Sequence, residues 1–319
     1  RTCCPICKAT AYSSIFRSGY DGLVGKYVEK YYLDSGRFDI KYLIGSIYEI
    51  VRCNACSFAY QKYIPNQAFM SELYEGWLDP VWGFRVDWGG DMTPHQFRTS
   101  ASIYRLIRAI GKPSTTIRVL DVGMGWSRWL IVAKALGCQV YGVELSPRRV
   151  EFAKSNGIEV VDWGDLVGQN YDLINCNQVL EHLSDPIAAL QTTVSALAPD
   201  GLISISVPNA GGIDRILQRF DWNIESCNGD PDLRRIIIGN NPIMAALPLQ
   251  HINLFTVKTL NHVLKRSALS VCRIDLRHAL NSWSLADGGL RGLVGIALDV
   301  LTRQRRQTSV IAAKIKRVV

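Results

Sequence analysis

The chain has 319 residues, 48% of them hydrophobic, and a formal net charge of +8. This length allows one large core with a smaller module beside it, and the charge suits anionic partners without specifying nucleic acid. No apolar run reaches the roughly 18 residues of a membrane-spanning helix, and a cysteine cluster stands where a secreted protein has its signal peptide. These features exclude an integral membrane protein with spanning helices, and we expect a cytoplasmic one.

Two Cys-x-x-Cys pairs come first along the chain. They are Cys4 with Cys7 and Cys53 with Cys56. Two such pairs supply the four thiolates that structural zinc prefers, and a closed four-sulfur set leaves no position for water. Cys3 could replace Cys4, although Cys4 has the regular spacing. The pattern predicts a zinc-ribbon-like module over residues 1–60, with four unligated buried thiols as the alternative.

Residues 61–112 are rich in Tyr, Trp and Gly, and they end in a helical pattern over 100–110. Gly111 and Pro113 terminate that helix. We expect a helical and loop connector that caps the domain following it. Tyr74 and His95 could cover a ligand there, although packing is the simpler role for both.

Strands and helices alternate from residue 113 to residue 319, the third predicted domain. Strands are expected over 117–122, 139–144, 158–162, 171–176 and 201–207, with helices over 128–136, 147–155 and 186–197 between them. A helix over 257–267 and strands over 270–276 and 308–316 complete the pattern. It predicts an α/β domain with a doubly wound, Rossmann-like, mostly parallel sheet of seven strands.

The first of these strands ends in a glycine-rich turn. Its distinctive residues are Asp121, Gly123, Gly125 and Ser127. The glycines let the backbone approach a ligand closely, and Glu144 at the end of the next strand suits ribose hydroxyls. A tight turn without a ligand is the alternative. The joint placement of the turn and Glu144 favours a nucleotide cofactor.

Two features argue against a nicotinamide dinucleotide. Arg128 stands where that fingerprint needs a third small residue, and Asp121 would place negative charge beside two phosphates. A cofactor with a zwitterionic amino-acid tail fits better. Backbone amides around Gly123 to Ser127 can bind its carboxylate, while Asp121 binds its ammonium directly or through water.

Residues 117–255 resemble the class I S-adenosylmethionine-dependent methyltransferases. The family's first motif matches 121–127, with serine where many members have glycine, and later matches follow in order at 144–145, 171–174, 177–186 and 197–209. The resemblance implies S-adenosyl-L-methionine as cofactor. The cofactor-binding residues that it implies are Asp121, Gly123, Gly125, Ser127, Glu144, Leu145, Asp165, Leu166 and Asn177. In this list, Asp165 and Leu166 are the acidic-apolar pair that the family has after its third strand. The alternative placement of that pair is Asp162 and Trp163.

Methyl transfer to a hydroxyl or an acidic C–H requires removal of a proton. His182 is the first candidate base, because it follows the fourth strand, where open α/β folds place their sites. Glu181 could orient His182 or a substrate hydroxyl, and His251 is the second candidate base. The simpler alternatives are a His182 that lines the cofactor pocket, a His251 that packs or contacts substrate, and a surface carboxylate at Glu181.

A four-cysteine module before such a core resembles a methyltransferase subgroup that acts on sugars, nucleotide-linked sugars and other small metabolites. Its sugar C-methyltransferases are most similar, and the segment 250–256 resembles theirs. They commonly carry a further carboxy-terminal domain that is missing here, so both carbon and oxygen remain candidate acceptor atoms. We expect a small-molecule acceptor, with a sugar or nucleotide-sugar favoured. The sequence does not indicate an oligomeric state.

Two other functions are compatible with parts of this pattern. A zinc module can also bind RNA, which would fit an RNA methyltransferase. Residues 1–60 carry few clustered Lys and Arg, and the fourth strand lacks the Asn/Asp-Pro-Pro-aromatic tetrad of amino-base enzymes, which argues against nucleic acid. A non-catalytic scaffold is the other alternative.

Residues 290–301 with the basic run 303–306 could form an amphipathic helix at a membrane, although a packed helix with a basic end is favoured.

Overall fold

A computed structural model of the chain describes residues 1–32, 39–78, 84, 94–220, 222, 242–272 and 307–314, and only the backbone of 94–99, 242 and 307–314. The residues form two compact units. Unit 1 comprises Arg1–Gly83, Glu181–Pro186 and Pro208–Leu260, and unit 2 comprises Phe84–Leu180, Ile187–Val207 and Asn261–Val319. Neither unit is one continuous segment, whereas the sequence analysis divides the chain at residues 60 and 112.

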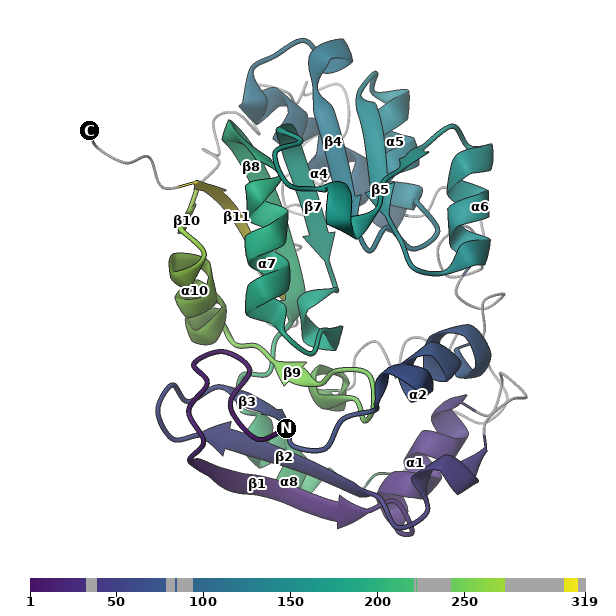
Figure 1. Cartoon of the computed structure of the whole chain (residues 1–319), viewed down its shortest axis with the longest axis vertical. Coiled ribbons are helices and arrows are strands. Elements are labelled where there is room, and N and C mark those ends of the chain that lie inside the picture. The colour runs from purple at the N-terminus through teal and green to yellow at the C-terminus, as the bar shows by residue number, and fades with distance from the viewer. Residues whose placement is uncertain are drawn as a thin grey trace. The chain divides into compact units, whose positions relative to one another are not determined.

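Unit 1 contains a four-stranded antiparallel sheet in the order β1-β2-β3-β9 (Figure 1). The strands are β1 (Tyr12–Gly19), β2 (Ile47–Cys53), β3 (Ala59–Gln61) and β9 (Asn253–Leu254). Three of them come from the predicted cysteine module. The fourth comes from a distant segment, because Tyr60 of β3 pairs with Asn253.

The core of unit 1 is strongly aromatic. Helices α1 (Leu23–Tyr32), α2 (Gln67–Glu72) and α8 (Ile213–Arg219) belong to the same unit. Trp222 lies with its ring centroid within 5.4 to 5.6 Å of the rings of Phe16, Tyr27 and Tyr48. Buried aromatic rings contribute large apolar areas. Unit 1 therefore has a hydrophobic core of its own besides its cysteines.

Unit 2 contains a sheet in the order β10-β11-β8-β7-β4-β5-β6. Its strands are β4 (Arg118–Val122), β5 (Gln139–Val143), β6 (Glu159–Val160), β7 (Tyr171–Asn177), β8 (Leu197–Pro208), β10 (Leu269–Val271) and β11 (Gln307–Lys314). The five strands from β8 to β6 are parallel, which confirms the predicted parallel Rossmann-like core. The chain order reverses between β4 and β7, and parallel sheets bind ligands at the carboxyl ends of strands beside such a reversal.

The helices of the methyltransferase-like segment are α4 (Pro94–Ile110), α5 (Arg128–Ala135), α6 (Pro147–Ser155), α7 (Pro186–Ser195) and α10 (Val257–Arg266). In Figure 1, α4 lies behind the sheet of unit 2 and α7 in front of it. Strand β6 is shorter than predicted, and β8 begins at Leu197, before the predicted start at residue 201. None of the helices in the described part of the chain is long and apolar enough to cross a membrane. The predicted basic segment 290–306 and the His95 side chain lie outside the described residues.

Candidate cofactor and catalytic site

The turn after β4 has an unusual backbone. Gly123, Gly125 and Ser127 all have positive φ angles, of 67°, 54° and 58°. The N–H groups of Gly123 and Met124 both donate to the Val143 carbonyl, and the Ser127 N–H donates to the Met124 carbonyl, so these donors are paired within the protein. The left-handed conformation also explains why glycine is common at the position of Ser127 in the family that this segment resembles. The buried Ser127 hydroxyl has no hydrogen-bond partner among the described residues, so it is available to a ligand.

Position 123 requires glycine for two reasons, its positive φ angle and a close contact with a neighbouring side chain. A Cβ atom at this position would lie 2.8 Å from Cγ2 of Val179, in the loop after β7. The Gly123 N–H also donates to the carbonyl of Val143 at 2.9 Å. The turns after β4 and β7 therefore meet where the strand order reverses, and a side chain at position 123 would separate them.

Glu144 fixes the glycine turn from the neighbouring strand. Its Oε2 accepts a hydrogen bond from the Gly125 N–H at 2.9 Å. Its Oε1 accepts from the N–H groups of Leu145 and Ser146 at 2.9 and 3.0 Å. A carboxylate has about four acceptor positions, so three backbone bonds leave one for a ribose hydroxyl. Glu144 is thus oriented in advance for the role that the sequence predicts.

Replacing Glu144 by alanine is expected to weaken S-adenosylhomocysteine binding by roughly 1.5 to 3 kcal/mol, the contribution of a hydrogen bond to a charged group. The change removes both the ribose acceptor and the bond to Gly125. Isothermal titration calorimetry gives the dissociation constant, and Glu151→Ala, at an exposed position on α6, is the matched control. An unchanged affinity in the Glu144 variant would remove the ribose assignment.

Asp121 is a buried carboxylate beside the turn. It is 3% exposed, and Asn175 Nδ2 donates to its Oδ1 at 2.8 Å. Burial raises the pKa of Asp121 to about 7, while the Asn175 hydrogen bond lowers it and the charge of Glu144 raises it further. A buried carboxylate gains most from a cationic partner. An ammonium group is a partner of this kind, and Leu145, next to Glu144 in the chain, is 88% exposed.

Cofactor affinity is expected to increase with pH through the raised pKa of Asp121. Without ligand, a carboxyl whose pKa is raised on folding contributes stability that is complete below about pH 3.8 and is lost as the pH rises through 7. The ammonium group binds the ionised form, so the dissociation constant of S-adenosylhomocysteine should fall roughly tenfold or more between pH 5.5 and 7.5. Calorimetry at both pH values measures this change. Asp121→Asn should make the affinity independent of pH over that range; an equal pH dependence in this variant would rule out Asp121 as its source.

The predicted cofactor residues after β6 and β7 differ in burial. Leu166 is fully buried and packs inside the unit, whereas Asp162, Asp165 and Asn177 are exposed. Asp162 and Asp165 both line a cavity of about 570 Å³. The acidic residues of both possible alignments are thus accessible, and the position of the adenine-side pair stays a prediction. Asn177 ends β7 at the carboxyl edge of the sheet.

The candidate catalytic residues come together in unit 1. His182 Nδ1 lies 2.9 Å from the Tyr74 hydroxyl and 2.9 Å from the carbonyl of Gln250. Because a carbonyl only accepts, Nδ1 carries the hydrogen and Nε2 is left as the acceptor, 3.7 Å from Glu181 Oε1. The His251 ring lies 4.9 Å from the His182 ring, centroid to centroid. The structure therefore groups the three predicted catalytic residues with Tyr74.

Burial controls the charges of this cluster. Burial lowers the pKa of His182 to about 4. It lowers the pKa of His251 to about 3, and the nearby charge of His182 contributes to this second shift. Burial raises the pKa of Glu181 to about 8. Both Glu181 oxygens are buried and have no hydrogen-bond partner among the described residues. His251 Nδ1 is bonded to the carbonyl of Met244, so its Nε2 is also an open acceptor.

These open acceptors could hold a metal ion. One ligand atom from each of Glu181, His182 and His251 lies within 4.8 Å of the others. Backbone carbonyls that fix the Nδ1–H tautomer are the usual support of histidine ligands. Sequence reasoning missed Gln250 as a partner of His182, although the segment 250–256 was recognised as a motif.

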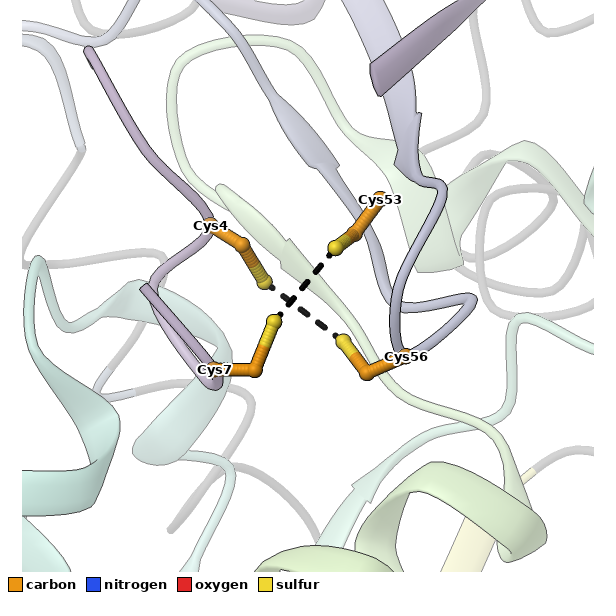
Figure 2. A group of neighbouring side chains, drawn as sticks. All are labelled: Cys4, Cys7, Cys53 and Cys56. Atoms are coloured by element: carbon orange, nitrogen blue, oxygen red, sulfur yellow. Dashed lines mark hydrogen bonds between the residues drawn. The ribbon is translucent and has the colours of Figure 1, made fainter. Parts of the chain in front are cut away.

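The four predicted zinc ligands converge in unit 1 (Figure 2). Their sulfur atoms lie within 4.8 Å of one another, with Cys4 Sγ 3.6 Å from Cys56 Sγ and Cys7 Sγ 3.4 Å from Cys53 Sγ. Four sulfurs bound tetrahedrally at about 2.3 Å from zinc lie roughly 3.8 Å apart, so these side chains fit that ion. Cys3 is not part of the group.

The two cysteine turns have the same backbone design. In the first, the Lys8 N–H donates to the Cys4 carbonyl at 3.0 Å, and in the second the Ser57 N–H donates to the Cys53 carbonyl at 2.9 Å. Lys8 and Ser57 both have left-handed φ angles, of 62° and 61°. We call these turns the first knuckle (Cys4–Lys8) and the second knuckle (Cys53–Ser57).

The chain is similar to several known methyltransferases. A ubiquinone biosynthesis O-methyltransferase from Xanthomonas campestris pv. campestris (strain B100) is 33% identical over 103 residues, which are 29% of this chain and 43% of that protein. The chain thus spans less than half the length of the curated relatives it matches. The magnesium protoporphyrin IX methyltransferase of Synechocystis PCC 6803 has a TM-score of 0.48 at 14% identity, covering 78% of this chain and 100% of that one.

A second solved structure is the 1,6-didemethyltoxoflavin-N1-methyltransferase of Burkholderia thailandensis, with a TM-score of 0.43 at 17% identity, covering 83% of this chain and 99% of that one. A family described as a methyltransferase domain matches residues 95–273, which are more than half of the chain. That match spans the glycine turn, Glu144 and the loop after β7. The chain belongs to this family of methyltransferase domains.

Proposed function

We propose that this protein is an enzyme that transfers a methyl group from S-adenosylmethionine to a hydroxyl group of a small-molecule acceptor, with a sugar or nucleotide-sugar as the first candidate. The observation that carries the proposal is the cradle formed by the left-handed turn 123–127, Glu144 and buried Asp121. The relatives support oxygen over carbon as the acceptor atom, because they are named O-methyltransferases. The net charge of +8 supports an anionic acceptor such as a nucleotide-sugar.

The cradle residues would hold the cofactor by complementary charge. Asp121 would bind the ammonium group, and the buried Ser127 hydroxyl would donate to the carboxylate. Glu144 would bind the ribose and Leu145 would cover the adenine. When bound, the cofactor supplies a methyl group that its sulfonium already activates. The protein's remaining tasks are to orient the acceptor, exclude water and remove its proton.

Proton removal is assigned to the cluster of Glu181, His182 and Tyr74. The Gln250 carbonyl and Tyr74 hydroxyl hold the His182 ring so that Nε2 is an acceptor. Nε2 would take the proton of the acceptor hydroxyl, and buried Glu181 would stabilise the imidazolium that forms. His251 would border the acceptor. Its low pKa keeps it neutral and avoids repulsion between two charged rings.

A second mechanism uses the same residues as ligands of a divalent cation. The open acceptors of Glu181, His182 and His251 favour it. A cation there would bind the acceptor hydroxyl and lower its pKa, so that no strong base is needed. Titration with Mg²⁺ or Mn²⁺ separates the mechanisms, because Glu181→Gln should abolish cation binding in the second and only slow turnover in the first.

Structural zinc is assigned to Cys4, Cys7, Cys53 and Cys56. The convergence of the sulfurs and the paired knuckles support this assignment. Burial raises the pKa of Cys4 to about 11, so metal binding must release protons from the cluster. With four sulfur ligands the ion has no open position, and its role would be structural.

The acceptor is identified by screening nucleotide-sugars, free sugars and phenols with methyl-labelled S-adenosylmethionine. The proposal expects a labelled O-methyl product from a sugar-containing acceptor, verified by mass spectrometry and alkaline stability. A phenolic product alone would replace the sugar assignment, and labelled RNA would revive the nucleic-acid alternative. Absence of S-adenosylhomocysteine binding would favour a non-catalytic scaffold.

A further inference from the structure

The loop Glu181–Pro186 carries two of the proposed catalytic residues, yet it belongs to unit 1, while its chain neighbours on both sides belong to unit 2. We propose that the first knuckle and strand β9 form a clamp that positions this loop, with Lys8 and Asn253 as positioning residues for His182. The inference rests on the proposed role of His182. A zinc ion bound to the four cysteines would then order the loop Glu181–Pro186 without contacting it.

Strand β9 forms the buried arm of the clamp. Asn253 is 1% exposed, and its Nδ2 donates to the carbonyl of Leu183 at 2.6 Å. The Asn253 backbone is paired with Tyr60 of β3, the strand that follows the second knuckle. Gln61 Nε2 donates to the His251 carbonyl at 3.1 Å. The sheet that holds the second cysteine pair therefore also holds the loop next to His182.

The first knuckle forms the exposed arm. The left-handed turn at Lys8 fixes the direction of this residue directly after Cys7, and its Nζ lies 2.9 Å from Asp185 Oδ2. Both side chains are about half exposed, and an exposed ion pair contributes little by itself. Arg1 strengthens this arm, because its guanidinium donates to the Ile252 carbonyl at 2.8 Å and to the Leu183 and Ser184 carbonyls at 3.4 Å.

The second knuckle provides a matched control within the same unit. Arg52, directly before Cys53, is bonded to both Asp214 oxygens at 2.8 Å. Asp214 belongs to α8 and not to the loop. Asp185→Asn and Asp214→Asn each remove the carboxylate partner of a cation next to a knuckle, and neither changes a cysteine. Asparagine also retains the helix-capping ability of Asp185 before α7.

The test is amide hydrogen exchange of peptides covering 181–185, with zinc content and S-adenosylhomocysteine affinity measured on each protein. Asp185→Asn and Lys8→Met should speed exchange roughly twofold to fivefold, and Asn253→Ala roughly tenfold, with zinc and cofactor binding retained. Asp214→Asn should leave the exchange of these peptides unchanged. Lys8→Arg, which keeps a cation at this position, should exchange at the rate of the parent protein and not at the faster rate of Lys8→Met. Zinc removal by a chelator should speed it in the parent protein.

Unchanged loop exchange in Asp185→Asn and Asn253→Ala would overturn the clamp, as would an equal increase in Asp214→Asn. If Asn253→Ala does not fold, Lys8→Met and its Lys8→Arg rescue decide the matter. None of these measurements needs the acceptor. A protein that transfers no methyl group can therefore still confirm the clamp, and an active one can contradict it.

Discussion

Changing both Cys53 and Cys56 to serine is expected to remove bound zinc and to lower the free energy of unfolding by roughly 3 to 5 kcal/mol. Four thiolates that hold one ion close the first knuckle against the second, and β1, β2 and β3 meet beside them. In small zinc-finger peptides the metal supplies nearly all of the folding energy. The expected loss is smaller here because unit 1 also has an aromatic core.

Metal analysis and denaturant unfolding measure the two effects. Cys3→Ser is the matched control, because Cys3 is adjacent to a proposed ligand but is not part of the sulfur cluster. The control should keep one equivalent of zinc and the stability of the parent protein. A parent protein that binds no zinc, or a double variant that keeps it, would contradict the zinc assignment.

Changing His182 to alanine is expected to lower methyl transfer by 10²- to 10⁴-fold while S-adenosylhomocysteine affinity stays unchanged. The side chain is held by the Tyr74 hydroxyl and the Gln250 carbonyl, and its Nε2 faces Glu181. Turnover with the identified acceptor and calorimetry with the cofactor product measure the two quantities. His262→Ala, at an exposed position on α10, is the control and should be fully active.

The pH profile of turnover identifies the group that must be ionised or deprotonated. A base works above its pKa, so activity should rise with pH near 4 if His182 alone limits the rate, since burial lowers its pKa to about 4. Activity should rise near 8 if Glu181 must be ionised, because burial raises its pKa to about 8. A His182→Ala variant with parental turnover would place the base elsewhere.

The parallel core of unit 2 was predictable from the sequence. Its strands and helices follow one another closely along the chain, and each is set by local patterns of apolar residues, glycine and proline. The glycine turn, Glu144 and the two cysteine pairs were predictable for the same reason, because their chemistry depends on residue type and short spacing. The left-handed angle of Ser127 could not be seen, since serine gives no signal for positive φ.

Contacts between distant residues were not predictable. Asn253 and Leu183 are 70 residues apart in the chain, and Gln61 and His251 are 190 apart. Burial of Leu166 also depends on packing. The sequence by itself determined the cofactor cradle, the cysteine set and the parallel core, since these follow from local pattern and residue chemistry. The tertiary structure alone decided that β9 completes the sheet of the cysteine module and that the loop of His182 belongs to unit 1, because long-range pairing depends on the whole packed chain.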